Sequence, residues 1–281
     1  MEEQKITAGQ IEMFTAYLRR EECAGGTVEK YRRDVYAFAR WLAGREVTKE
    51  GVAGWKAQLL TKQYAPTTIN SMLAAVNAFF RFMGWEHLRI RFLKIQRQMF
   101  RDASKELSRA EYDRLIKTAR NRGQDRLALL LETIGGTGIR VSEVRHVTVE
   151  AARQGKAEIS LKGKIRTILL PNKLCRKLLK YAGKNKIASG GIFLTGSGTH
   201  LSRRQIWAEM KKLCRYAGVE PCKVFPHNLR HLFAITFYKA SRDIVRLADI
   251  LGHSSIETTR IYLLITGVEY RKQLDRLGLI K

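Results

Sequence analysis

The sequence predicts a mainly α-helical protein with a small β-sheet, in which an N-terminal four-helix bundle precedes a C-terminal mixed α/β domain. Apolar residues recur at helical spacing through most of the 281 residues, as on the buried faces of amphipathic helices. Only one pair of neighbouring segments has the pattern of a β-hairpin. A basic stretch without periodicity lies between the two parts, and the length suits two modest domains.

Four helices are expected within residues 1–88. Thr7 and Gln10 form a capping box, a hydroxyl three residues ahead of an amide, so the first helix begins there. Gly25-Gly26 is expected to break this helix, and Pro66 suits the first turn of the fourth. The four apolar stripes lie within residues 11–18, 28–42, 52–59 and 69–80. Helices joined by short loops are typical of a compact bundle.

Residues 89–106 lose this periodicity and are interpreted as a basic linker between the domains. The second domain, 107–281, opens with a capping box at Ser108 and Glu111. Helices are expected as far as Ile134, followed by a turn at 135–138. The later elements are a short helix from Val141, strands Ala157–Leu161 and Ile165–Leu170, helices 172–182 and 202–217, and a mostly helical segment from Pro226.

The charge of the chain predicts a polyanionic partner. Lys and Arg number 52 and Asp and Glu 26, so the formal net charge is +26. Residues 1–100 carry +6 and residues 101–281 carry +20, spread over many segments. A folded surface that faces a polyanion explains this better than a disordered basic tail.

The cysteines and the N-terminus predict a reducing, cytoplasmic setting. The four cysteines lie far apart and contain no Cys-x-x-Cys pair, so a zinc site is not expected: Cys23, Cys175, Cys214 and Cys222. The first residues are acidic and polar, unlike a secretory signal. An apolar run of 18 residues, which a membrane span would need, is absent from the sequence.

Arg140 is the first candidate site residue. It follows a glycine turn and precedes a short helix, with Glu143 three residues further on. Glu143 could orient the guanidinium, and the helix N-terminus adds positive potential for an anion. Taken alone, a surface arginine paired with an i,i+3 carboxylate explains the pattern at least as well.

A second candidate is His227-Asn228-Leu229-Arg230-His231. His227 and Arg230 are three residues apart and share a helix face. Arginine offers two parallel N–H donors to a phosphate, and histidine can move a proton near pH 7. His231 could equally be a packed core histidine.

Two further candidates are Tyr262 and Lys162. Ser254 and Glu257 form a capping box, so a helix is expected directly after His253, with Tyr262 about two turns along it. Lys162 lies at the expected hairpin tip. Singly, a half-buried tyrosine and a solvated lysine are the simpler interpretations.

Together the candidates fit one reaction on a basic protein. A tyrosine attacks a phosphodiester and becomes covalently linked to it. The two arginines hold the non-bridging oxygens, where charge develops. Lys162 protonates the departing oxygen and His227 handles the tyrosine proton.

These segments resemble the tyrosine recombinase (phage integrase) family. The family pattern is Thr-Gly-x-Arg-x-Ser-Glu, a hairpin lysine, His-x-Leu-Arg-His, and Leu-Gly-His with a tyrosine nine residues later. The resemblance implies that residues 7–85 form the family's SAM-like core-DNA-binding domain and that residues 107–270 are catalytic. The implied catalytic residues are Arg140, Lys162, His227, Arg230, His253 and Tyr262, supported by Glu143 and His231. Basic residues expected to contact DNA are Arg89, Arg91, Lys94, Lys164, Arg203 and Arg204.

The resemblance also implies the course of the reaction. A 3′-phosphotyrosyl intermediate would retain the bond energy, so neither ATP nor a metal is needed and no cofactor is expected. Four protomers would clamp two paired duplex sites with inverted half-sites and exchange strands through a Holliday junction. The segment 267–281 would dock on a neighbouring protomer. An additional arm-binding domain is not expected before Ser108.

Alternatives stay open at this point. A mobile-element integrase and a chromosome-dimer resolvase of the Xer type both fit, with or without accessory factors that bend DNA or set direction. A type IB topoisomerase shares the chemistry but religates the same strand. A DNA-binding protein without activity and a basic RNA-binding protein would form no covalent adduct.

Overall fold

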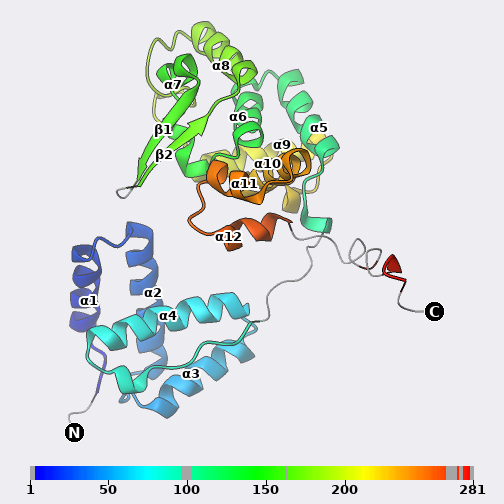
Figure 1. Ribbon diagram of the computed structural model, residues 1–281. Coiled ribbons are helices and arrows are strands. Elements are labelled where there is room, and N and C mark those ends of the chain that lie inside the picture. The colour runs from blue at the N-terminus through cyan, green and yellow to red at the C-terminus, as the bar shows by residue number, and fades with distance from the viewer. Residues whose placement is uncertain (1–3, 96–102, 162–163, 264–270, 272–274, 279–281) are drawn as a thin grey trace. The chain divides into compact units, whose positions relative to one another are not determined.

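The structure is a computed structural model, and it describes residues 4–95, 103–161, 164–263, 271 and 275–278. The chain forms two compact units, residues 1–97 and 98–281 (Figure 1). As predicted, helices dominate and a single hairpin supplies the described strands.

The N-terminal unit is a four-helix bundle. Its elements are α1 (Ala8–Arg20), α2 (Gly25–Leu42), α3 (Lys49–Thr61), α4 (Pro66–Phe82) and the short 3₁₀ helix η1 (Glu86–Leu88). Thr7 and Gln10 form both bonds of the predicted capping box. Gly25 and Gly26, expected to break a helix, are the first residues of α2. Aromatic side chains fill the core, with Phe38 and Trp55 centroids 4.9 Å apart.

Two asparagines of α4 hold the chain that follows the bundle. Asn77 bonds both backbone groups of Ile90, at 2.9 and 3.1 Å, and Asn70 bonds both of Leu93, at 2.9 and 2.7 Å. Ile90 and Leu93 also pack against the core of the bundle. The first residues of the segment interpreted as a linker are therefore attached to the N-terminal unit.

The C-terminal unit surrounds its central helix α6. The helices are α5 (Arg109–Asn121), α6 (Asp125–Thr137), α7 (Val149–Gln154), α8 (Asn172–Lys184), α9 (Arg203–Ala217), α10 (Pro226–Ser241), α11 (Ile244–Leu251) and α12 (Ile256–Arg260). The 3₁₀ helices are η2 (Ala103–Lys105), η3 (Val141–His146), η4 (Pro221–Lys223) and η5 (Ile261–Leu263). The antiparallel strands are β1 (Lys156–Leu161) and β2 (Lys164–Leu169), with Ile159 opposite Arg166. α6 packs against α5, α8 and α10.

The glycine-rich segment after Ile134 was predicted to be a turn, and most of it is helix. α6 continues to Thr137, and only Gly138, with φ of +64°, ends it. A Cβ on Gly135 would lie 2.7 Å from the Tyr112 ring. Gly135 therefore permits close packing of α6 against α5, which the local sequence does not reveal.

The helix before Tyr262 also differs from the prediction. Its N-cap is Ser255, whose hydroxyl accepts from the Glu257 N–H, and not Ser254. α12 ends at Arg260, and Tyr262 lies in η5. The short helix expected from Val141 is likewise a 3₁₀ helix.

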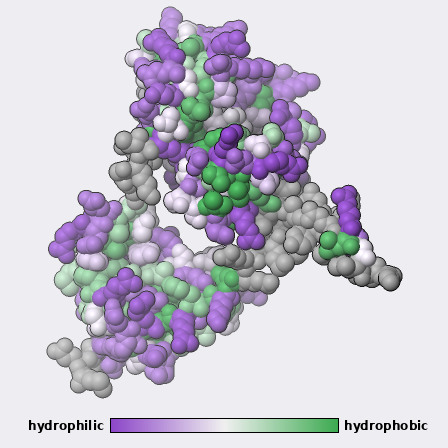
Figure 2. Space-filling view, in the orientation of Figure 1, coloured by the Kyte–Doolittle hydropathy of each residue, from purple (hydrophilic) through white to green (hydrophobic). Residues whose placement is uncertain are grey.

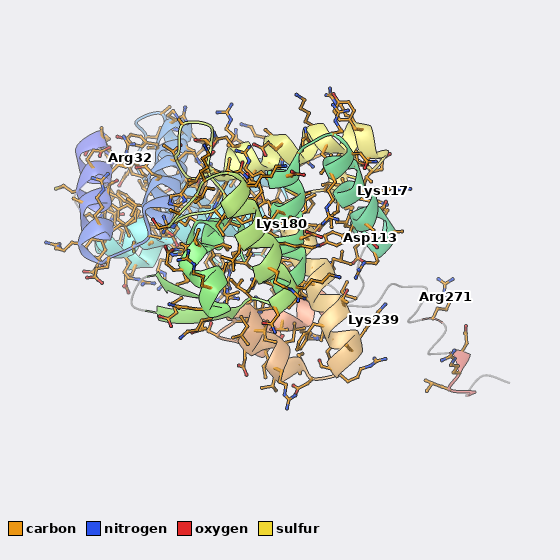
Figure 3. All side chains as sticks on the ribbon, turned by 90° about the horizontal axis from the view of Figure 1, so that it is seen from above. Arg32, Asp113, Lys117, Lys180, Lys239 and Arg271 are labelled. Carbon is orange, nitrogen blue, oxygen red and sulfur yellow. The ribbon has the colours of Figure 1, made fainter. Side chains whose placement is uncertain are left out.

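The visible surface is largely hydrophilic, with an apolar area at α11 and α12 (Figure 2). Val245 on α11, Ile256 on α12 and Ile261 at the start of η5 are exposed. Basic side chains such as Lys180 and Lys239 extend from the outside of helices (Figure 3). Within the described ranges, none of the helices combines the length and the apolar character that a membrane span requires.

Candidate active site

Arg140 and Glu143 form a compact unit at the start of η3. The Arg140 backbone N–H donates to Glu143 Oε2 at 2.9 Å, and Nη1 donates to Oε1 at 3.0 Å. The Glu143 carboxylate is buried, whereas the Arg140 side chain stays 39% exposed. Gly138 makes this turn possible, because a Cβ there would lie 2.5 Å from the Phe233 ring. The turn thus presents one side of Arg140 to solvent.

Arg230 reaches the same place from α10. It is 4% exposed, and it donates to the carbonyl of Gly138 and, at 2.7 Å, to that of Leu251. Nη2 also lies 2.9 Å from Nε2 of His253. Burial lowers the pKa of the Arg230 guanidinium, and a hydrogen bond with the Tyr262 side chain opposes that shift.

Tyr262 lies among three histidines. It is 5% exposed, and its ring centroid is 5.7 Å from His227, 5.3 Å from His231 and 5.7 Å from His253. Burial and the neighbouring Arg230 lower the pKa of His227, so this imidazole is neutral near pH 7 and can accept a proton. His231 Nδ1 lies 3.8 Å from Glu106.

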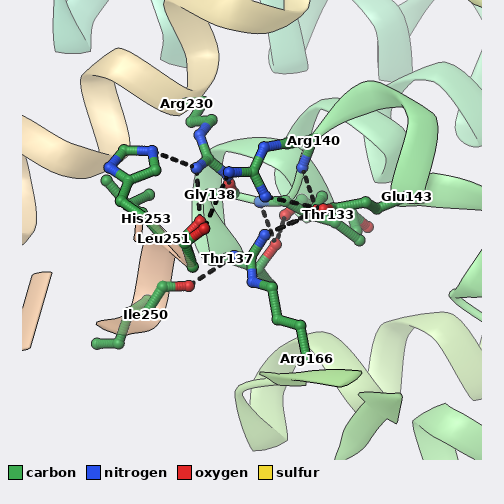
Figure 4. Close-up of polar contacts among 12 residues, drawn as sticks. Thr133, Thr137, Gly138, Arg140, Glu143, Arg166, Arg230, Ile250, Leu251 and His253 are labelled. Atoms are coloured by element: carbon green, nitrogen blue, oxygen red, sulfur yellow. Dashed lines mark hydrogen bonds and ion pairs between the residues drawn. The ribbon is translucent and has the colours of Figure 1, made fainter. Parts of the chain in front are cut away.

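The C-terminal end of α11 connects the arginines. Its last turn offers three consecutive carbonyls, and each accepts from a different arginine (Figure 4). Ile250 accepts from Arg166 at 2.6 Å, Leu251 from Arg230, and Gly252 from Arg140 at 3.1 Å. Gly252 has φ of +61° and ends the helix. The C-terminal end of a helix carries a partial negative charge, so the end of α11 favours the three arginine side chains that bind there.

Arg166 and Thr259 were missed by the sequence analysis. Arg166 Nη1 donates to both Glu143 oxygens, at 3.1 and 3.0 Å. The sequence did contain a signal for it. Arg166, Ile168 and Leu170 are two residues apart, so they lie on the same face of an extended chain, and Ile168 and Leu170 are buried. A charge on the core side of a strand requires a partner. No comparable sequence signal marks Thr259, whose hydroxyl lies 2.9 Å from His253 Nδ1.

A cavity of about 650 Å³ opens beside these groups. Arg140, Glu143, Arg166, Gly252 and His253 are among its lining residues. Arg140 and Arg166 line the cavity together with two carboxylates, Glu143 and the exposed Asp249, and Arg230, bonded to the Leu251 carbonyl, adds a third guanidinium group beside them. The excess of positive charge suits an anion such as a phosphate group.

The other predicted site residues are placed differently. Lys162 lies outside the described residues, and Lys164 is the first residue of β2. Arg203 and Arg204 are exposed on the first turn of α9. Arg89, Arg91 and Lys94 are exposed in the N-terminal unit. The segment 267–281 is described only at 271 and 275–278.

The bundle, the mixed α/β unit and this cluster define a protein of the phage integrase class. The model of the phage integrase family matches residues 105–266, and that of the phage integrase N-terminal SAM-like domain matches residues 11–87. The chain belongs to the phage integrase family, which confirms the family and fold class predicted from the sequence.

The relatives and structural neighbours are recombinases. The chain is 30% identical to tyrosine recombinase XerA of Pyrococcus furiosus, over 100% of this chain and 98% of the relative. It is 26% identical to tyrosine recombinase XerD of Vibrio cholerae, over 95% and 94%. The fold is similar to XerH bound to a palindromic difH substrate, with a TM-score of 0.72, 16% identity and coverage of 99% and 90%. It is also similar to a lambda integrase tetramer bound to a Holliday junction, with a TM-score of 0.72, 16% identity and coverage of 90% and 76%.

Proposed function

We propose that the chain is a site-specific DNA recombinase that cleaves and rejoins DNA through a 3′-phosphotyrosyl intermediate. One observation carries the proposal. The hydroxyl-bearing ring of Tyr262 is buried against the three histidines, next to Arg230, in the unit that also presents Arg140. A nucleophile, a proton acceptor and phosphate-binding guanidinium groups are thereby gathered in one chain.

The cleavage step follows from these groups. The Tyr262 oxygen forms a bond to phosphorus as the bond to the 5′-oxygen breaks, and the phosphoryl group stays esterified to the 3′-oxygen. The tyrosine proton passes to neutral His227, and the leaving 5′-oxygen takes a proton from Lys162. Arg140 and Arg230 bind the non-bridging oxygens and stabilise the charge that develops there. Rejoining is the reverse attack by a 5′-hydroxyl of the partner strand.

The assembly is part of the proposal. The partner is double-stranded DNA with paired inverted half-sites, on which four protomers exchange strands through a Holliday junction. The solved lambda integrase tetramer on a Holliday junction supports this arrangement. We expect the enzyme to act on the nucleoid in the cytoplasm, with accessory factors where the element requires them.

The element served is proposed to be mobile DNA. The curated relatives named XerA, XerC and XerD favour a second candidate, chromosome-dimer resolution. The two differ in the location of the core site. A site whose inverted repeats flank the gene indicates a mobile element, and a single chromosomal site far from the gene indicates a resolvase.

Covalent trapping tests the proposal. A core site is selected from random duplexes by binding to the full chain, and a series of nicked suicide substrates is made from it. Wild-type protein should form an adduct that survives denaturing electrophoresis. Specific binding without an adduct at every nick position would assign the chain to non-catalytic DNA binding.

A plasmid assay separates recombination from topoisomerase activity. A supercoiled plasmid with two directly repeated sites should yield two smaller circles. Relaxation of a plasmid without sites, together with no recombinants from the two-site plasmid, would indicate a type IB topoisomerase instead.

A further inference from the structure

Arg166 is a partly buried charged residue to which the proposed chemistry gives no task. Its side chain is 13% exposed. It comes from β2, shares the core side of that strand with the buried Ile168, and points to the end of α11 (Figure 4). Burial lowers its pKa to about 10, against the opposing effect of Glu143, so it stays charged at pH 7. Removing a guanidinium group from water costs free energy, so its presence here suggests a role beyond packing.

The contacts of Arg166 join three parts of the site. Nη1 donates to both Glu143 oxygens and Nη2 to the Ile250 carbonyl at 2.6 Å. A Cβ on Gly252 would lie 2.4 Å from Arg166 Nε and 2.5 Å from Cδ. The guanidinium therefore lies against the Gly252 backbone as closely as only glycine allows.

The Glu143 carboxylate is shared by two arginines. Arg140 bonds one oxygen through Nη1 and the other through its backbone N–H, and Arg166 bonds both. Without Arg166, the carboxylate would keep only its two bonds from Arg140, and the Ile250 carbonyl would lose a donor. Glu143 and Arg140 could then shift together, and Arg140 would no longer be held facing the cavity.

We propose that Arg166 is a positioning residue, which locks Glu143 and the α11 end so that Arg140 is held ready for the scissile phosphate. The inference rests on the proposed recombinase function. Arg166 therefore acts through Arg140 on the binding of the phosphate oxygens. It does not act on the transfer of a proton to the leaving group.

Two substrates and a double variant test this. Arg166→Gln should slow single-turnover cleavage about 10²-fold, as expected when a reacting group is misplaced by about an ångström. The loss should be equal on a normal phosphodiester and on a 5′-bridging phosphorothiolate, whose leaving group needs no proton. Arg140→Ala/Arg166→Gln should cleave no more slowly than Arg140→Ala.

Two further variants distinguish a specific effect of Arg166 on cleavage from the general effect of replacing an arginine. Arg166→Lys should lose less than Arg166→Gln, because one ammonium can reach Glu143 or Ile250 but not both. The matched control is Arg109→Gln, a 69% exposed arginine on α5, which should cleave normally. Thermal midpoints and DNA affinity are compared for all variants.

The outcomes separate the two proposals. If wild-type protein forms no adduct, the recombinase function fails. If wild type reacts and Arg166→Gln cleaves within twofold of it, the positioning role is wrong. Full rescue by the phosphorothiolate, or a further loss in the Arg140→Ala background, would also overturn it. Should Arg166→Gln fail to fold, the same comparisons are made with Arg166→Lys.

Discussion

Arg230 Nη2 lies 2.9 Å from His253 Nε2, which defines the state of the imidazole. A guanidinium can only donate, so Nε2 accepts and the ring proton is on Nδ1. Nδ1 lies 2.9 Å from the Thr259 hydroxyl, whose oxygen accepts the hydrogen bond from the Nδ1–H. This tautomer is inferred from the hydrogen-bond partners. Burial, followed by the charges of Arg230 and Arg140, lowers the pKa of His253 to about 4 and keeps it neutral.

The first prediction concerns stability in acid. The pKa of His253 is 6.5 in the unfolded reference and about 4 in the folded chain. Between these values the unfolded state binds more protons, so the free energy of unfolding falls as the pH falls from 6.5 to 4. The lowered pKa of His227 acts in the same direction. Calorimetry at pH 7.5 and 5 should show a smaller decrease in the midpoint of the C-terminal unit for His253→Gln than for wild type.

A control histidine is available in the other unit. His87 is exposed in η1, and His87→Gln should keep the wild-type change between pH 7.5 and 5. Equal changes for wild type and His253→Gln would show that His253 is not the neutral, half-buried hydrogen-bond acceptor described above.

The second prediction concerns Arg140 and Arg230, the arginines proposed to bind the scissile phosphate. Arg140→Lys and Arg230→Lys keep a charge but lose the planar fork, and each loses carbonyl contacts at the end of α11. Removing one such transition-state donor costs about 3–4 kcal/mol, so cleavage should fall about 10²–10³-fold. Single-turnover cleavage of the suicide substrate measures this. Near-normal rates for both variants would exclude the proposed role.

The third prediction identifies the nucleophile. Tyr262→Phe should bind DNA with nearly wild-type affinity and form no covalent adduct, because only the hydroxyl is removed. Tyr216→Phe is the control, since Tyr216 is 50% exposed on α9 and its variant should react normally. Adduct formation by Tyr262→Phe would transfer the assignment to another tyrosine, and Tyr270 would be tested next.

Local sequence patterns predicted most of the elements. The capping boxes predicted at Thr7 and Ser108 both form, because they depend on residues three positions apart. Gly135 was misjudged because its role is set by Tyr112, far away in sequence. The same limit applies to Arg166, whose partners Glu143 and Ile250 come from other elements. Site geometry that depends on tertiary contacts was therefore the least predictable part.

The fourth prediction concerns DNA affinity and salt. A net charge of +26 suggests several phosphate contacts per protomer, and each neutralised phosphate contributes about −0.9 to the log–log slope of binding against salt. Filter binding between 50 and 300 mM salt should give a slope steeper than about −2. A shallower slope would mean that the basic excess serves another partner. Arg203→Ala/Arg204→Ala should make the slope less negative, because phosphate contacts are lost. Arg109→Ala should change the slope less.

The last prediction assigns the general acid to Lys162 and not Lys164. The family resemblance places the catalytic lysine just before the glycine of the hairpin, and Gly163 separates the two candidates. Only a lysine within hydrogen-bond reach of the 5′-oxygen can protonate it, so Lys162→Ala should slow cleavage of a normal phosphodiester about 10²–10⁴-fold. Lys164→Ala should mainly weaken binding.

The 5′-bridging phosphorothiolate distinguishes these roles, because its sulfur leaves without a proton. It should restore cleavage by Lys162→Ala, while Arg140→Ala stays impaired, since the phosphate oxygens still need their donors. Rescue of Lys164→Ala in place of Lys162→Ala would reverse the assignment. If the thiolate rescues neither variant, the proton has another source, and His227 becomes the candidate. Its lowered pKa makes it a poor proton donor at pH 7, which is the physical reason to expect the lysine instead.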